Sequence, residues 1–363
     1  MIKNKNKKLK ILVAMSGGVD SSVAAQLLKN QGHDVAGVFL HFWKDENAPD
    51  KSENKCCSLE SFNDAKTVAT KIGIPMYSFN FANEFKEAVV DYFLAEYKAG
   101  RTPNPCVVCN KKIKLGLLLK HARALGYDGL ASGHYLKRMD VDGETRIFKA
   151  KDDAKDQSYF LYTFTQAELK RLYFPLANYT KPQVRAIAAK HGLPTASKSE
   201  SQDICFLSGP HNIFLKRYLK MKPGPIKRRE DGVEVGRHEG LPLYTVGQRR
   251  GIEIGGTGPY YVAEMDFKNN TLWVVRTWDD KLLYRQDFTV HSVNWTDKKK
   301  PTLPLQCQVV IRYGHAPVAC IVKKGKKTNE VLVSLTKPTR AVTIGQSAVF
   351  YKGRRILGGG VIA

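Results

Sequence analysis

A turn rich in serine and glycine stands between two regular patterns near the start of the sequence. This turn, SGGVDSS at residues 16–22, follows the apolar run ILVA and precedes a helical pattern. Glycines let an anion approach the backbone, and the free N–H groups and dipole of a helix N-terminus favour phosphate. Asp20 is unusual in an anion site, and its carboxylate suits a bound Mg²⁺ or a helix cap. Because neither GxxxxGK[ST] nor GxGxxG is present, we predict a phosphate loop that is neither a Walker P-loop nor a dinucleotide fingerprint.

Cysteines provide the second set of side chains that suit chemistry. Cys106 and Cys109 stand in RTPNPCVVCNKKIK, and Cys205 stands in SESQDICFLSG. A cysteine close to a helix N-terminus and to lysines is predicted to have a lowered pKa and to supply thiolate. A zinc site would need a second pair of cysteines or histidines, and none follows at a suitable spacing. Cys307 and Cys320 lie in alternating β patterns, where we expect them to be small buried apolar residues.

Composition points to a polyanionic partner. Lys and Arg number 58 against 34 Asp and Glu, which gives a net charge of +24. A charge of this size favours nucleic acid over a membrane surface. No run reaches the about 18 apolar residues of a membrane span, and the basic N-terminus has no apolar signal segment. The odd count of seven cysteines is unlike a secreted disulfide framework, so we expect a reducing, cytoplasmic location.

The elements that must position these groups alternate between strand and helix in the first part of the chain. This alternation predicts an α/β domain with a parallel sheet, whose ligands bind at the carboxyl ends of the strands. Both the SGGVDSS turn and Gly133–His134 stand at such ends, and RTPNPCVVCN is predicted to be a loop. The predicted strands are KILVAM, DVAGVFLHFW, PMYSFNF and GLASGHY, and the predicted helices cover residues 20–30, 57–72, 83–98 and 111–125.

The pattern changes after about residue 210, where turns become frequent and the strands become short. From about residue 258, alternating segments such as TLWVV, LQCQVVIRY and QSAVFY predict β structure that closes into a barrel. We therefore predict three domains: a catalytic domain at 1–210, a small linker domain at 211–281 and a C-terminal β-barrel at 282–363.

The motifs, taken in order, resemble those of a known enzyme family. SGGVDSS resembles the pyrophosphate loop of the adenylating ATP pyrophosphatases. Behind it, RTPNPCVVCN, ASGHY, KDQSYFLY, SESQDICF and YTVGQRRG resemble the corresponding blocks of the tRNA-specific 2-thiouridylases. That resemblance implies an ATP pyrophosphatase domain, a linker domain and a tRNA-binding barrel. It also implies that ATP adenylates the C2 oxygen of the wobble uridine in glutamate-, glutamine- or lysine-type tRNA, before sulfur replaces that oxygen.

The resemblance further implies roles for the cysteines. Cys205 would receive sulfur as a persulfide from a donor protein, and Cys109 would attack this persulfide, leaving a Cys109–Cys205 disulfide. Some members have Asp where this chain has Cys106. An alternative is that Cys106, Cys109 and Cys205 ligate an iron–sulfur cluster with an open iron.

Other site residues carry over from matched motifs. For ATP these are Ala14, Met15, Ser16, Gly17, Gly18, Val19, Asp20, Ser21, Ser22, Leu40 and Gly133, with Asp20 as a Mg²⁺ ligand. For the target base and tRNA they are Asn104, Pro105, Cys106, His134, Lys155, Asp156, Gln157, Arg312, Tyr313 and Gln346.

Two other functions compete with this prediction. A small-molecule adenylating amide ligase would explain the SGGVDSS turn, but neither the charge nor the paired cysteines. An RNA-binding protein with a degenerate nucleotide domain would explain the charge and the barrel, but not the intact loop. We expect the thiouridylase to act as a monomer with tRNA and a sulfur-donor protein as its partners.

Overall fold

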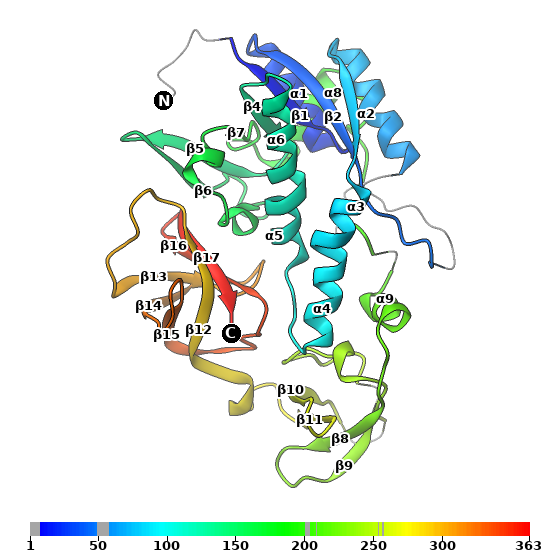
Figure 1. The fold of residues 1–363 in the computed structure, drawn as a ribbon, viewed down its shortest axis with the longest axis vertical. Coiled ribbons are helices and arrows are strands. Elements are labelled where there is room, and N and C mark those ends of the chain that lie inside the picture. The colour runs from blue at the N-terminus through cyan, green and yellow to red at the C-terminus, as the bar shows by residue number, and fades with distance from the viewer. Residues whose placement is uncertain (1–7, 49–57, 200–203, 208, 253, 256–257) are drawn as a thin grey trace.

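The computed structural model describes residues 8–48, 58–199, 204–207, 209–252, 254–255 and 258–363 (Figure 1). The first domain is built on a five-stranded sheet in which every pairing is parallel, as predicted. From one edge to the other the strands are β3 (Met76–Asn80), β2 (Asp34–His41), β1 (Lys10–Ala14), β4 (Gly129–Ser132) and β7 (Leu172–Tyr173). The chain moves outward from β1 through β2 to β3 and then returns to β4. The strand order therefore reverses beside β1, where sheets of this class bind ligands.

Alternate residues of β1 face the two helical layers of this domain. Ile11 and Val13 pack in one apolar cluster with side chains of α1 (Val19–Asn30), α2 (Leu59–Ile72) and α8 (Lys181–Lys190). Leu12 belongs to the other cluster, which includes α6 (Gly116–Ala124) and α4 (Tyr92–Lys98). This two-residue period fixes the sheet between its helices and holds the carboxyl end of β1 in place.

The segment RTPNPCVVCN is not the loop that we predicted. Helix α5 (Pro105–Cys109) begins within it and continues through a π-helical turn, Asn110–Lys114, into α6. Asn104 caps α5 by accepting a hydrogen bond from the Val107 N–H at 3.3 Å, and Pro105 occupies the first turn. Proline favours this position because its missing N–H is not needed there. Cys106 and Cys109 are thus both helical, and the predicted start at residue 111 was wrong.

The predicted helix over residues 83–98 is also interrupted. It consists of α3 (Ala82–Phe85), a π-helical segment at Lys86–Asp91 and α4. Other predicted ends are confirmed, since Gly73 ends α2 in the left-handed conformation at φ 71°. Glycine adopts that conformation without the steric cost that a Cβ imposes.

The middle of the chain forms a small second unit. Helix α9 (His211–Tyr218) leads into a four-stranded sheet of mixed direction. Its order is β10 (Tyr261–Asp266), β11 (Thr271–Val275), β8 (Gly224–Arg228) and β9 (Glu234–His238).

The C-terminal part closes into the predicted barrel, because β12 pairs with both β15 and β17. The strand order is β12 (Tyr284–Trp295), β15 (Val331–Arg340), β14 (Val318–Lys324), β13 (Leu305–Val310), β16 (Ser347–Lys352) and β17 (Arg355–Ile362).

A hairpin of the first domain, β5 (Leu136–Val141) and β6 (Glu144–Lys149), extends the barrel's sheet through β17. This hairpin was not predicted from the sequence. The first domain and the barrel thereby share a sheet as well as an interface (Figure 1).

The motif KDQSYFLY holds the first domain against the barrel. Tyr159 donates its hydroxyl hydrogen to the Ser347 carbonyl at 2.8 Å, and the Tyr162 hydroxyl lies 3.1 Å from the Ser347 Oγ. The Asn294 amide donates to the Tyr162 carbonyl at 2.6 Å. Because both tyrosines are buried, these bonds fix where the barrel's loops meet the first domain. Within the described ranges, no helix is long and apolar enough to cross a membrane.

Candidate active site

A cavity of about 700 Å³ opens at the carboxyl ends of β1, β2 and β4. The phosphate turn, the start of α5, the start of α8 and the segment around Cys205 all contribute to its wall. Predicted site residues in that wall are Ala14, Met15, Ser16, Gly17, Gly18, Val19, Asp20, Ser21, Leu40, Cys106, Gly133, His134, Lys155, Gln157, Cys205 and Tyr313.

The phosphate turn is held by its own hydroxyl groups. The Ser21 hydroxyl accepts from the Ser16 N–H at 3.2 Å and donates to the Gly18 carbonyl at 3.1 Å. The Ser22 hydroxyl donates to the same carbonyl at 2.9 Å, and Ser22 is fully buried outside the cavity wall. Ser22 therefore shapes the turn in this structure, while Ser16 and Ser21 line the space.

Two glycines bring neighbouring backbones close to this turn. Gly17 has φ +70°, and a Cβ there would stand 2.2 Å from the Ser61 carbonyl oxygen. At Gly133, after β4, a Cβ would stand 2.7 Å from the Ser21 nitrogen. Neither position has room for a side chain. The glycines thus leave the N–H groups at the start of α1 open to an anion.

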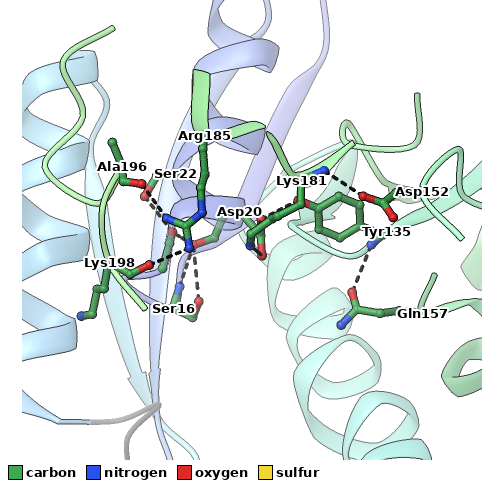
Figure 2. Close-up of polar contacts among 12 residues, drawn as sticks. Ser16, Asp20, Ser22, Tyr135, Asp152, Gln157, Lys181, Arg185, Ala196 and Lys198 are labelled. Atoms are coloured by element: carbon green, nitrogen blue, oxygen red, sulfur yellow. Dashed lines mark hydrogen bonds and ion pairs between the residues drawn. The ribbon is translucent and has the colours of Figure 1, made fainter. Parts of the chain in front are cut away.

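Asp20 forms a partly buried ion pair with Lys181, which was not predicted from the sequence (Figure 2). The Lys181 Nζ lies 2.8 Å from both carboxylate oxygens, and the Tyr135 hydroxyl donates to one of them at 2.7 Å. Lys181 is 7% exposed, and its backbone N–H donates to the Asp152 carboxylate at 2.8 Å. Its place at the first position of α8 is the only sequence signal, because nothing else separates it from the chain's many basic residues. A positive charge is therefore fixed where phosphates would lie.

This pairing bears on the expected metal sites. Mg²⁺ in nucleotide sites is commonly held by one or two carboxylates together with the phosphates. The Asp20 carboxylate fits such a role only if Lys181 yields its place, so the Mg²⁺ assignment stays a prediction. Across the described part of the chain, no group of three or more His, Cys, Asp or Glu side chains is placed to hold a metal ion. The iron–sulfur cluster on Cys106, Cys109 and Cys205 likewise stays a prediction.

The three cysteines differ in their access to the cavity. Cys106 is exposed and Cys205 is half-buried, and both lie in the cavity wall. Cys109 is 6% exposed and packs within the apolar cluster against which Cys205 also packs. The segments that carry the two predicted catalytic cysteines thus converge on the phosphate site, with Cys109 beneath its surface.

The chain that leads to Cys205 is anchored from α8. Arg185 donates to the carbonyl groups of Ala196 at 2.6 Å and Lys198 at 3.1 Å (Figure 2). Lys198 itself pairs with Asp64 on α2 and lines the cavity. Residues 200–203, which include part of the SESQDICF motif, lie outside the described residues. The Arg185 hydrogen bonds thus hold Lys198, a second cation, in the wall of the cavity that the phosphate turn also lines.

His134 lies in the wall as a neutral base. Its Nδ1 is 2.8 Å from the Ser132 hydroxyl. Desolvation, assisted by the positive charge of Lys114, lowers the pKa of His134 to about 3. The imidazole therefore carries no charge near neutral pH and offers hydrogen bonding rather than a charge to a substrate.

Comparison with known proteins identifies the family of this chain. Residues 9–209 match the model described as the tRNA methyl transferase HUP domain. Residues 212–276 match its PRC-barrel domain, and residues 285–362 match the aminomethyltransferase beta-barrel domain. The tRNA-specific 2-thiouridylase MnmA of Chloroflexus aggregans is 46% identical over 97% of this chain and 98% of its own length. The tRNA-specific 2-thiouridylase MnmA of Sodalis glossinidius is 44% identical over 98% of this chain and 97% of its own length.

The chain belongs to the tRNA-specific 2-thiouridylase family. This confirms the resemblance seen in its motifs, while the domain boundaries at 210 and 282 stay predictions. Among solved structures, NMN synthetase from Francisella tularensis aligns over 55% of this chain and 69% of its own, at 18% identity and a TM-score of 0.33, a likeness too weak to support an inference.

The residues that the 2-thiouridylase motifs assign to tRNA are divided between the cavity and the domain interface. Lys155 and Gln157 line the cavity, although the Gln157 side-chain oxygen also accepts from the Tyr135 N–H at 3.1 Å. Asp156 accepts from the Ala150 N–H at 2.8 Å and the Ser158 hydroxyl at 2.6 Å, and burial raises its pKa. Asp156 therefore has a structural role in this state.

The barrel contributes one residue to the cavity wall. Tyr313 follows β13, and its ring lies 4.5 Å from that of Phe160 between centroids. Arg312 beside it is exposed. Gln346 instead donates to the carbonyl groups of Thr102 at 3.1 Å and Pro103 at 3.0 Å, across the domain interface. With Asn104 capping α5 and Pro105 buried, these three residues support the site without lining it.

Several residues of the wall were not predicted. They supply apolar surface, hydroxyl groups and three cations. Ser132, Tyr135, Phe160 and Ser199 stand in matched motifs, but no role was assigned to them there. They include Phe42, Ser61, Lys114, Ser132, Tyr135, Phe160, Lys181, Lys198 and Ser199.

Proposed function

We propose that this chain is an ATP-dependent tRNA 2-thiouridylase that replaces the C2 oxygen of the wobble uridine by sulfur. The observation that supports this proposal best is that one cavity is lined by the phosphate turn, four lysines and the Cys205 thiol. A phosphate site alone would suit many adenylating enzymes. The Cys205 thiol in the same wall suits replacement of the activated oxygen by sulfur.

The first step uses the phosphate turn. The uridine C2 oxygen attacks the α-phosphorus of ATP, the bond to the β-phosphate breaks, and pyrophosphate leaves. Negative charge that develops on the phosphates is stabilised by the α1 N-terminus and by the ammonium groups of Lys181, Lys114 and Lys198. Mg²⁺, when bound with ATP, would neutralise the phosphates further, and Asp20 is the residue that would hold it. The adenylated oxygen then departs as AMP, a far better leaving group than the carbonyl oxygen.

The second step uses the two cysteines. A donor protein leaves a persulfide on Cys205, and its terminal sulfur is delivered to C2 as AMP leaves. The Cys109 thiolate attacks the Cys205 Sγ, which breaks the persulfide S–S bond and forms a Cys109–Cys205 disulfide. An external reductant, a thiol or dithiol, then restores both thiols. Since Cys109 is buried while Cys205 faces the cavity, we infer that α5 shifts when tRNA binds.

Nucleoside mass spectrometry tests the proposal directly. Unmodified glutamate-, glutamine- or lysine-type tRNA would be incubated with Mg-ATP, a protein persulfide donor and wild-type, Cys109→Ser or Cys205→Ser protein. We expect 2-thiouridine with the wild type and none with either variant. Release of AMP with a free amino acid as acceptor would support the amide ligase instead. Tight tRNA binding without pyrophosphate release would support an RNA-binding protein without this activity.

A further inference from the structure

A second pair of cysteines lies in the barrel, away from the motifs of the reaction. Cys307 on β13 and Cys320 on β14 are register partners in an antiparallel pairing. Their sulfur atoms are 3.6 Å apart, and both are free thiols. From the sequence alone, each was predicted to be a small buried apolar residue. The sheet register makes them neighbours.

Their geometry is that of a dithiol ready to close. Directly opposed residues of antiparallel strands have Cα atoms about 4.5–5.5 Å apart, which falls within the range that a disulfide spans. Closure therefore requires the sulfurs to approach by rotation about the side-chain bonds, with no change of register. Cys320 is 2% exposed within the barrel core, whereas Cys307 is half-buried and packs against that core. One sulfur is thus more accessible to a reagent than the other.

The electrostatic relation between the two thiols assigns them different roles. With Cys320 donating its hydrogen to the Cys307 sulfur, the pKa of Cys307 is lowered, while the same bond and burial raise the pKa of Cys320. The more accessible sulfur is therefore also the better source of thiolate. An oxidant would meet Cys307 first.

We propose that Cys307 and Cys320 form a redox-sensitive modification site that a low-molecular-weight disulfide oxidises to a cross-strand disulfide. The Cys307 thiolate attacks the reagent's S–S bond and releases one thiolate, giving a mixed disulfide on Cys307. Cys320 then attacks the Cys307 Sγ and releases the second thiolate. The two cysteine protons pass to the released thiolates, so two thiols are oxidised while one reagent disulfide is reduced to two thiols.

The site lies at the base of a hairpin that reaches the proposed active site. Between Cys307 and Cys320 the chain forms the end of β13, residues 311–317 and the start of β14. This connection carries Arg312 and Tyr313, and Tyr313 lines the cavity. A disulfide closing the hairpin would restrain these residues. An effect of this restraint on tRNA binding rests on the proposed function, whereas formation of the disulfide does not.

Peptide mapping tests bond formation on the full chain. The protein would be equilibrated with oxidised glutathione, alkylated and digested with trypsin without reduction. Because Arg312 lies between the two cysteines, the disulfide would join two tryptic peptides. We expect this joined species in the wild type and in a Cys109→Ser/Cys205→Ser double variant, and its loss in Cys307→Ser. Cys320→Ala, which keeps a small apolar group in the core, should retain glutathione on Cys307 instead.

Hydrogen exchange of residues 311–317 tests the restraint. We expect several-fold slower exchange in the oxidised than in the reduced protein, and no difference in Cys307→Ser. Failure of the wild type to form the joined peptide, while Cys106 accepts glutathione, would overturn the site. A joined peptide with unchanged exchange would overturn the restraint of the hairpin. Neither result depends on thiolation activity, so the proposed function would stand or fall separately.

Discussion

The two cysteine pairs of this molecule are opposites in construction. Cys307 and Cys320 meet because strand register places them in contact, with their sulfurs 3.6 Å apart. Cys109 and Cys205 come from distant segments, and only Cys205 lies in the cavity wall while Cys109 is buried. Two thiols in contact can form and break a disulfide without movement of the backbone. A persulfide carrier instead benefits from a partner that is withheld until the base is activated, because early attack would release the sulfur unused.

The largest expected effect comes from removing Cys205, with removal of Cys307 as the matched control. Cys205→Ser should abolish 2-thiouridine formation, because the serine oxygen cannot carry a persulfide. The matched variant Cys307→Ser should keep wild-type activity under reducing conditions, since that sulfur lies outside the cavity wall. Nucleoside mass spectrometry on both variants with the same donor measures this. Equal losses of activity would break the distinction between a catalytic and a structural pair.

A second experiment separates activation from sulfur transfer while leaving both thiol pairs intact. Lys181→Met removes the ammonium group that pairs with Asp20 at the phosphate turn. We expect tRNA-dependent pyrophosphate release to fall by about 10²–10³-fold, as when one preorganised transition-state donor is lost. Lys190→Met, at the exposed last position of the same helix, should change the rate little. Lys181 would be a purely structural residue if binding of Mg-ATP and release of pyrophosphate both remained unchanged.

The sequence could predict features that depend on local pattern and could not predict those that depend on assembly. The turn at residues 16–22 and the parallel sheet follow from glycines, hydroxyls and apolar periodicity, all of which are local. The start of α5 was missed because Pro103 and Pro105 suggested a loop, although Asn104 and Pro105 together form a helix start. Local signals of turn and cap are similar in the sequence, and only packing decides between them.

Assembly decides the rest of the site in the same way. Lys181 reaches Asp20 only because α8 packs against α1. Cys307 and Cys320 touch because of a β13–β14 register that alternating patterns leave open by steps of two residues. Thiol accessibility and the pKa of His134 likewise arise from burial rather than from motifs.

Thiol accessibility should rank the cysteines of both pairs. With iodoacetamide under native conditions, we expect Cys106 and Cys205 to be alkylated several-fold faster than Cys109, and Cys307 faster than Cys320. Time-resolved peptide mass spectrometry measures the five rates in one sample. Adding tRNA and Mg-ATP should raise the rate at Cys109 and leave the rate at Cys320 unchanged. Rapid labelling of Cys109 in the free protein would contradict the withheld partner that distinguishes the catalytic pair.

The smallest expected effect concerns His134. Protonation of this cavity residue should make the stability of the fold depend on pH in the acidic range. Its folded-state pKa of about 3 lies below the ordinary value of 6.5, because burial disfavours the imidazolium. The neutral ring therefore contributes its full stability above pH 6.5, and this contribution is lost as pH falls from 6.5 toward 3. Since the ring is only half-buried, solvent screening should keep the loss under about 1 kcal/mol for each pH unit.

Urea unfolding at pH 7.5 and pH 5.0 measures this dependence. The wild-type midpoint should fall more between these two values than the midpoint of His134→Gln, because glutamine keeps a polar side chain that does not titrate. His291→Gln in the barrel serves as the matched control, since this histidine is exposed and its loss should leave the wild-type dependence intact. If the urea midpoint fell equally in the wild type and in His134→Gln, protonation of His134 would not destabilise the fold, which would contradict its lowered pKa.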